Sequence, residues 1–180
     1  LHAVGRDARA TVEYARERIA RAIGADPAEV IFTSGGTEAD NLAVKGMYWK
    51  RHSADPARRR ILVSSIEHHA VEETCEWLET HQGAVIEWIP VDAQGLVHPD
   101  TVRELIAKNP ADVALVTVMW ANNEVGTIQP IAEIAQLAAE YGIPMHSDAV
   151  QAFGAVPVNF RESQVTTLAI SGHKIGGPMG

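Results

Sequence analysis

The chain of 180 residues is predicted to adopt an α/β fold in three layers, with a mainly parallel sheet between two layers of helices. Segments of strand character alternate along the chain with segments whose apolar residues recur at helical spacing. The stretches Ile61–Val63 and Val113–Val118, inside two of the expected strands, are almost entirely apolar, which is typical of strands covered on both faces. The length and the hydrophobic content of 46% suit one globular domain.

The first elements follow from periodicity and from turn residues. Apolar side chains recur every three or four positions over Arg6–Ile23, which predicts a helix, and Gly24 is well placed to end it. The β-branched and aromatic segment Val30–Thr33 is expected to form a strand. The glycine-containing turn Ser34–Thr37 then leads into an expected helix over Glu38–Trp49.

From residue 60 onwards the two kinds of segment alternate regularly. The remaining expected strands are Arg60–Ser64, Ala84–Ile89, Val113–Met119, Pro144–Asp148 and Thr167–Ile170. The remaining expected helices are Ala70–His81, Pro99–Lys108 and Ile131–Tyr141. Helices placed between successive strands are the connections that a parallel sheet requires.

Composition excludes several classes of function. The formal charge of −8 argues against a nucleic-acid partner, and the one basic run, Arg58–Arg60, is interpreted as a solvated loop. No apolar run approaches the roughly 18 residues that span a bilayer, so no membrane association is expected. The single cysteine, Cys75, excludes an internal disulfide and suits a reducing, cytoplasmic location. The chain starts without Met and stops in a glycine-rich turn, so we expect a piece of a longer protein.

Polar residues directly follow the expected strands. In open α/β sheets, ligands bind beyond the carboxyl ends of the strands. The groups found there are Ser34–Thr37, Glu67–His69, Trp120–Glu124, Asp148–Gln151 and Ser171–Lys174. We therefore expect Lys174, Asp148, His68 and the Gly36-Thr37 turn to converge on one pocket.

Three of these groups together match the needs of pyridoxal 5'-phosphate. Lys174 lies on the glycine-rich turn that follows the apolar strand Thr167–Ile170. A desolvated amine at this sheet edge would form a Schiff base with a carbonyl; the alternative is a surface lysine on a turn. Asp148 could pair with a protonated ring nitrogen, or be a loop acid or a partner of His146. The Ser34–Thr37 turn opens a helix and could hold a phosphate, with Thr37 as a simple N-cap being the alternative.

The remaining candidates are a histidine and a cysteine. His68 suits stacking on a cofactor ring or relaying protons. A metal site with Glu67 and Glu72 is disfavoured, because the spacing matches no standard ligand signature. Cys75 lies in an apolar helical pattern and is expected to be an inert, packed thiol.

Five motifs in order along the chain carry a family resemblance. They are Ser34–Ala43, Glu67–Ala70, Asn122–Gly126, Asp148–Gln151 and Ser171–Lys174. With them the chain resembles the class V aminotransferase group of pyridoxal-phosphate enzymes, and within it the cysteine desulfurases. The resemblance implies the large domain of the PLP-dependent transferase fold, which is aspartate aminotransferase-like.

The resemblance also implies a role for each matching residue. Lys174 would bind the cofactor covalently and later move protons, and His68 would stack on the ring and take part in acid-base steps. Asp148 would pair with the ring nitrogen. The ring oxygen would contact Gln151, with Asn123 close by, and the phosphate would be held by Gly36, Thr37, Ser171 and His173.

The implied activity is the removal of sulfur from L-cysteine. The products would be L-alanine and an enzyme persulfide, which supplies iron-sulfur cluster assembly or another sulfur-transfer pathway through an acceptor protein. A homodimer is also implied. Alternatives are another class V enzyme, such as a selenocysteine lyase or an aminotransferase, and a non-catalytic module that kept the fold for partner binding.

The resemblance assigns some family residues to parts outside this sequence. The nucleophilic cysteine lies well beyond the lysine in the family, and Cys75 does not match its motif. The arginine that binds the substrate carboxylate, the small C-terminal domain and a short N-terminal segment are likewise expected elsewhere. Residues 1–180 would then be most of the large cofactor-binding domain, and we expect this chain alone to be inactive.

Overall fold

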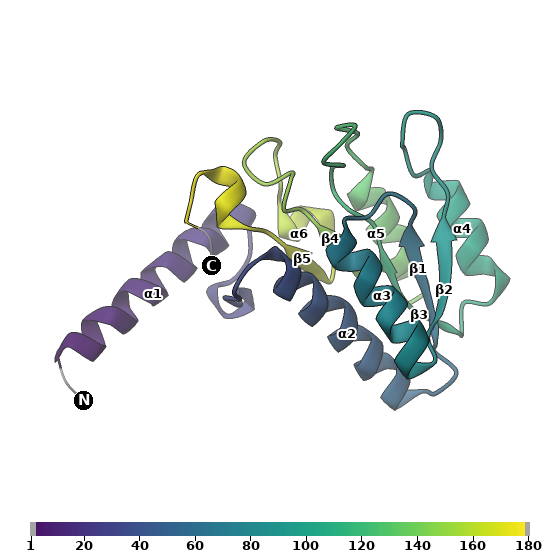
Figure 1. Ribbon diagram of the computed structural model, residues 1–180, viewed down its shortest axis with the longest axis horizontal. Coiled ribbons are helices and arrows are strands. Elements are labelled where there is room, and N and C mark those ends of the chain that lie inside the picture. The colour runs from purple at the N-terminus through teal and green to yellow at the C-terminus, as the bar shows by residue number, and fades with distance from the viewer. Residues whose placement is uncertain (1–2, 179–180) are drawn as a thin grey trace.

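Five parallel strands form one sheet at the centre of the molecule (Figure 1). The computed structural model describes residues 3–178. The strands are β1 (Arg60–Ser64), β2 (Val85–Ile89), β3 (Val113–Thr117), β4 (Met145–Asp148) and β5 (Thr167–Ala169). Their order across the sheet is β2-β1-β3-β4-β5, and each neighbouring pair is parallel.

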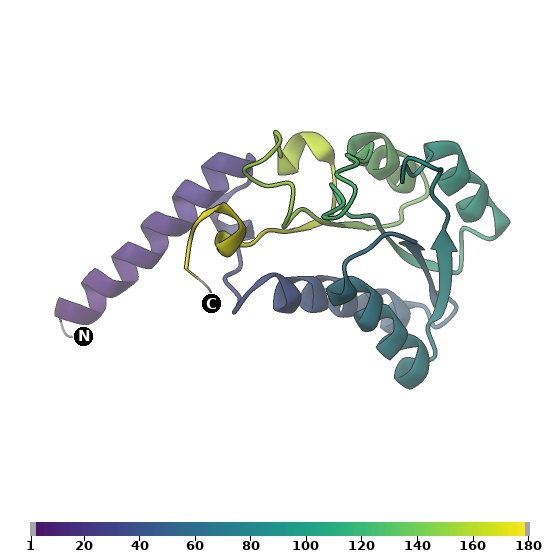
Figure 2. The same cartoon turned by 45° about the horizontal axis from the view of Figure 1, so that its top comes forward.

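Helices cover both faces of this sheet, so the predicted three-layer α/β fold is confirmed. The α-helices are α1 (Ala3–Ile23), α2 (Gly36–Ala54), α3 (His69–Gln82), α4 (Pro99–Lys108), α5 (Ile131–Glu140) and α6 (Phe160–Ser163). Figure 2 shows α2 and α3 on one face and α4, α5 and α6 on the other. No helix among residues 3–178 is both long enough and apolar enough to cross a bilayer.

The two central strands owe their apolar sequences to this double cover. Every residue of β1 and of β3 is buried. Alternate side chains point to opposite faces, so Leu115 packs into the core beneath α2 and α3, whereas Val116 packs into the core beneath α4 and α5. Cys75 lies in the first of these cores with no exposed surface, as predicted.

The segment Val30–Thr33 is not a strand, so that prediction was wrong. Its residues have strand propensity, but they pair with no strand in the described sheet, and Ile31 is 69% exposed. The preceding helix α1 forms as predicted but projects away from the sheet (Figure 1). Of its residues only Ala20 and Ile23 are buried, because the rest of the helix has no described element beside it.

The three shortest helices were not predicted from the sequence. Two 3-10 helices, η1 (Pro27–Glu29) and η2 (Gly172–Ile175), and the four-residue helix α6 are too short to show a period. The most consequential of these is η2, because it carries the lysine of the last motif rather than leaving it on an open turn.

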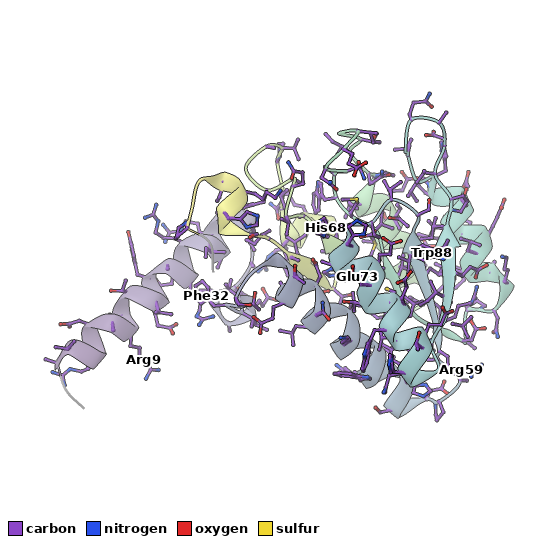
Figure 3. The ribbon with its side chains drawn as sticks, in the orientation of Figure 1. Arg9, Phe32, Arg59, His68, Glu73 and Trp88 are labelled. Atoms are coloured by element: carbon purple, nitrogen blue, oxygen red, sulfur yellow. The ribbon has the colours of Figure 1, made fainter. Side chains whose placement is uncertain are left out.

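All five strands end at the same edge of the sheet because they run in parallel. His68 lies at this edge, just after β1, whereas Arg59 lies at the opposite edge, just before β1 (Figure 3). The polar groups that follow β1, β3, β4 and β5 are thereby brought to one end of the molecule.

A buried arginine links several elements at the opposite edge, so the interpretation of Arg58–Arg60 as a solvated loop was wrong for Arg60. Arg60 is 7% exposed, and its Nε donates to Asp112 Oδ1 at 2.7 Å while Nη1 bonds Glu87. The same guanidinium donates to the carbonyls of Leu105 and Asn109, each at 3.0 Å. One guanidinium thus donates hydrogen bonds to acceptors on β2, at the end of α4 and on the turn before β3.

Replacing this arginine should destabilise the protein strongly. Arg60→Met removes the guanidinium donor from two carbonyls and one of the two side-chain donors from each of two carboxylates, so we expect the free energy of unfolding to fall by roughly 3–5 kcal/mol. Arg103→Met is the matched control, because Arg103 pairs with Glu140 at 3.4 Å with both side chains about half exposed. That change should cost about 0–1 kcal/mol. Equal losses in urea unfolding would contradict the assignment.

Candidate active site

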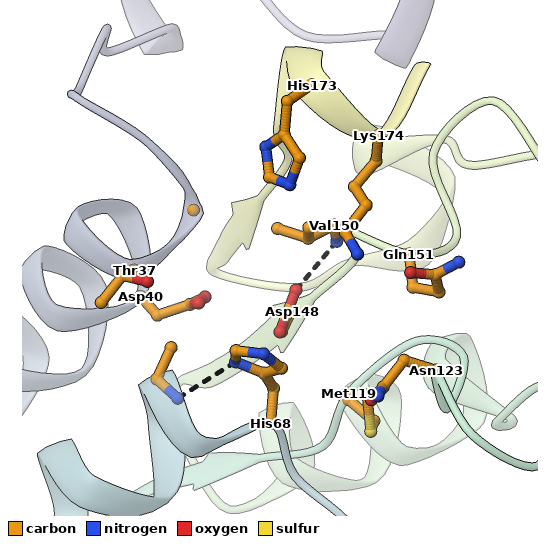
Figure 4. A pocket seen from close by; sticks show the side chains of 12 residues that line it. Thr37, Asp40, His68, Met119, Asn123, Asp148, Val150, Gln151, His173 and Lys174 are labelled. Atoms are coloured by element: carbon orange, nitrogen blue, oxygen red, sulfur yellow. Dashed lines mark hydrogen bonds between the residues drawn. The ribbon is translucent and has the colours of Figure 1, made fainter. Parts of the chain in front are cut away.

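One cavity of about 260 Å³ opens at the carboxyl edge of the sheet. It is lined by Gly36, Thr37, Asp40, His68, Ala70, Met119, Asn123, Asp148, Val150, Gln151, His173 and Lys174. Figure 4 shows that Lys174 and His173 enter from one side and that His68 faces them from the other. The start of α2 and the segments after four strands therefore supply the lining.

Of the predicted site residues, Ser171 alone does not line this cavity. Its hydroxyl lies 2.7 Å from His173 Nδ1, so it contacts the pocket through its neighbour. Lys174 is exposed on η2, and the expectation of a desolvated amine was therefore wrong. The short helix carries the lysine beyond the buried end of β5, into solvent at the pocket mouth. The roles assigned to these residues stay predictions.

Asp148 presents a buried carboxyl to the cavity. The residue is 5% exposed, and Oδ1 accepts a hydrogen bond from the backbone N–H of Val150 at 2.8 Å. Burial, together with the negative charge of Asp40, raises the pKa of Asp148 to about 6. A cation at this carboxyl would offset both effects.

The histidine two residues before Asp148 pairs with another acid. His146 is fully buried, and its Nε2 lies 3.1 Å from Asp40 Oδ1, while Nδ1 lies 2.9 Å from Thr167 Oγ1. His146 thus bonds Asp40 rather than Asp148, and the alternative in which it is the direct partner of Asp148 is wrong. Residues two apart in a strand point to the same face, but the two nitrogens of this imidazole contact Asp40 on α2 and Thr167 on β5.

His68 caps a helix and also lines the cavity. It is the N-cap of α3, and its Nδ1 accepts the backbone N–H of Ala70 at 3.1 Å. A neutral His68 therefore carries its proton on Nε2. The ring lies at the cavity below Asp148 (Figure 4), which is the placement that stacking on a bound ring requires.

The turn before α2 brings backbone close to the cavity. The N-cap is Gly35 and the helix begins at Gly36, so Thr37 lies in the first turn and is not the cap. A Cβ at Gly36 would lie 2.9 Å from Val150 Cγ2, so only glycine fits there without displacement. The first N–H groups of a helix have no intrahelical acceptor, and here they lie beside the cavity.

Sequence reasoning missed Asp40 and Glu67. No sequence pattern assigned Asp40 to the site, yet it is 1% exposed and lines the cavity. Its position three residues after Thr37 is the usable signal, since residues at that spacing share one face of a helix. Glu67 belongs to a motif, but its carboxyl contacts residues far away in the chain, which no local pattern indicates.

The whole chain matches one protein family. Residues 1–180 fit the family model described as aminotransferase class-V. Together with the parallel sheet and the cavity at its carboxyl edge, this match means that the chain belongs to the class V aminotransferase family.

Two similar proteins within this family are named as cysteine desulfurases. An IscS-like cysteine desulfurase of Mycobacterium tuberculosis is 55% identical over 180 residues, which are 100% of this chain and 46% of that protein. The cysteine desulfurase IscS of Dictyoglomus turgidum is 47% identical, over 100% of this chain and 44% of its own length. The chain thus spans about half the length of these curated relatives.

Solved structures agree in fold. A structure described as SspA in complex with cysteine has a TM-score of 0.92 and 38% identity, and the match covers 100% of this chain and 50% of that one. A NifS-like protein has a TM-score of 0.91 and 34% identity, covering 99% and 48%.

Asp148→Asn should stabilise the ligand-free protein. Because burial raises the pKa of Asp148 to about 6, the folded state holds a proton between about pH 4 and 6 that the unfolded state has released. Stability therefore falls as pH rises through this window, and the loss is complete above pH 6. Asparagine does not titrate, so the variant should gain on the order of 2–3 kcal/mol at pH 7.

Urea unfolding at pH 4 and pH 7 tests this expectation. Asp7→Asn, on the exposed face of α1, is the control and should follow the wild-type pH profile. If Asp148→Asn shows the wild-type slope as well, the carboxyl of Asp148 does not titrate in this range.

Proposed function

We propose that the protein containing this chain is a pyridoxal-phosphate-dependent cysteine desulfurase, which converts L-cysteine to L-alanine and leaves the sulfur as a persulfide on an enzyme cysteine. The observation that carries the proposal is one cavity lined by Lys174, Asp148 and His68 beside the first turn of α2. The relatives named as cysteine desulfurases and the neighbour titled as a complex with cysteine support the substrate.

The residues of the cavity fit the cofactor. Asp148 is a buried carboxyl whose pKa is raised by burial and by Asp40, and a protonated ring nitrogen is the cation it requires. The absence of a side chain at Gly36 lets a phosphate approach the free N–H groups of α2. These two features support a place for the ring nitrogen at Asp148 and a place for the phosphate at the start of α2.

Lys174, Asp148 and His68 would each contribute a different step to the reaction. When bound, the cofactor supplies an electron sink for bond cleavage at the substrate. Lys174 Nζ would hold it covalently and afterwards carry a proton to or from the substrate, while Asp148 keeps the ring nitrogen protonated. His68 would stack against the ring and exchange protons at Nε2, because its Nδ1 caps α3.

The other polar residues would orient the cofactor. Gln151 and Asn123 would bond the ring oxygen, and both line the cavity. The phosphate would contact Gly36 and Thr37 on one side and His173 on the other, with Ser171 acting on the imidazole of His173.

The rest of the proposal concerns the whole protein. We propose that residues 1–180 form most of its large cofactor-binding domain, and that it works as a homodimer in the cytoplasm. Its persulfide sulfur would pass to an acceptor protein for iron-sulfur cluster assembly or another sulfur-transfer pathway. The name IscS among the relatives supports this assignment.

The assay measures alanine and sulfide released from L-cysteine by the full-length protein, together with its visible absorbance. Lys174→Ala should abolish the covalent cofactor spectrum and lower turnover by roughly a hundredfold to ten-thousandfold. Lys45→Ala is the matched control, because Lys45 lies over the Trp77 ring outside the cavity, and it should be unaffected. A wild-type protein that binds the cofactor but leaves L-cysteine intact would overturn the substrate assignment.

Cys75→Ser should leave sulfur transfer intact. The thiol has no exposed surface, and burial raises its pKa far above the usual range, so it supplies no nucleophilic thiolate. The buried hydroxyl should lower stability by about 1–3 kcal/mol. Persulfide formation per folded molecule should stay at the wild-type level, and its loss in a folded variant would assign Cys75 a chemical role.

A further inference from the structure

The carboxyl group of Glu67 joins two strand ends beneath the cavity. Its Oε1 accepts a hydrogen bond from Ser64 Oγ at 2.5 Å and another from the backbone N–H of Met119 at 2.7 Å. Ser64 is the last residue of β1, and Met119 lies just beyond β3. The carboxyl thus connects the ends of β1 and β3. These neighbouring strands mark the point where the strand order changes, because the chain goes from β1 outward to β2 and then returns past β1 to β3.

Its second oxygen has no partner. Oε2 of Glu67 is shielded from solvent and has no hydrogen-bond partner among the described residues. An ionised carboxylate in that position would leave its charge without water and without a donor on one of its two oxygens. Such burial is strongly unfavourable for a charge, whereas a proton on Oε2 removes the charge altogether.

The surrounding groups also disfavour a charge on Glu67. Asp148 faces it from the end of β4 and Asp40 from α2, and both are acids. From α3 the nearby group is the thiol of Cys75. Burial, with added repulsion from Asp148 and Asp40, raises the pKa of Glu67 to about 8 despite the two hydrogen bonds to Oε1.

We propose that Glu67 is a positioning residue that acts as a neutral carboxylic acid, holding the His68 turn against the end of β3 without adding a second negative charge beside Asp148. His68 follows Glu67 directly, so the two bonds to Oε1 fix the turn that carries the imidazole. The side-chain amide of Asn122 reinforces this link by donating to the carbonyl of Ile66 at 3.0 Å.

This inference rests on the proposed function, because Asp148 matters as a partner of the cofactor ring nitrogen. The three acids at the cavity then differ in the partner of their carboxyl group. Asp40 has a hydrogen bond with His146 Nε2 at 3.1 Å, Asp148 would have the ring nitrogen, and Glu67 has its own proton. If Glu67 were ionised, it would compete with Asp148 for that single cationic partner.

Glutamine is a close mimic of a protonated glutamate, which makes the first test direct. In cofactor-free full-length protein, the folded state should keep the Glu67 proton between about pH 4.5 and 8, where the unfolded state has lost it. The wild-type unfolding constant should therefore rise more steeply with pH than that of Glu67→Gln, by up to about tenfold per pH unit between pH 5.5 and 7.5.

Glu72→Gln is the matched control for this measurement. Glu72 lies on α3 with its side chain 38% exposed and pairs with His69 at 3.1 Å, so its loss should leave the wild-type slope unchanged. Parallel profiles of wild type and Glu67→Gln, or a Glu67→Gln protein less stable than wild type at pH 7.5, would overturn the proposal.

The second test uses the cofactor-loaded full-length protein. Glu67→Gln keeps an oxygen that can accept both hydrogen bonds, so its dissociation constant for pyridoxal phosphate at pH 7 should stay within about twofold of wild type. Glu67→Ala removes both hydrogen bonds. Its dissociation constant for pyridoxal phosphate should therefore rise by about tenfold, which is the magnitude expected when hydrogen bonding between neutral groups is lost. Equal weakening in both variants would show that the negative charge is needed and would overturn the neutral form.

The two tests separate this inference from the proposed function. A wild-type protein that fails to bind pyridoxal phosphate would count against the proposed function. The pH profile of the cofactor-free protein would still decide whether Glu67 carries the proton.

Discussion

The parallel alignment of five strands is the constraint on which the site depends. Because each strand points the same way, the segments after β1, β3, β4 and β5 meet at one edge, although they lie far apart in the sequence. The crossover connections that parallel strands require place α3 on one face, beside α2, and α4 and α5 on the other (Figure 2). The same helices bury both faces of β1 and β3, so stability and the gathering of polar groups have one origin.

A second constraint is the balance of charge beneath the cavity. Asp40, Glu67 and Asp148 are close enough for their charges to interact, and burial makes each negative charge expensive. Asp40 has a hydrogen-bond partner in the His146 imidazole. Burial and the negative charge of Asp40 raise the pKa of Asp148, so the electrostatics of the cavity favour a cationic group at this carboxyl, as the proposed function requires.

The sequence predicted most of this arrangement, because a residue that directly follows a strand must lie at that edge of the sheet. The elements from β1 onwards and the convergence of His68, Asp148 and Lys174 follow from such local patterns. The failures were long-range. Val30–Thr33 has strand propensity but finds no partner strand, and the contact of Asp40 with His146 joins residues 106 apart. The exposure of Lys174 depends on a 3-10 helix that is too short to leave a periodic signal.

The N-cap on α3 has a chemical meaning beyond helix stability. An imidazole has two nitrogens that can exchange protons, but Nδ1 of His68 already accepts a hydrogen bond from the Ala70 N–H. Proton traffic at this ring is therefore restricted to Nε2, and a proton that entered at Nδ1 would have to release the first turn of the helix. The helix cap thereby leaves Nε2 as the nitrogen available for proton exchange. The backbone at the start of α3 thus determines the side from which the ring would exchange protons.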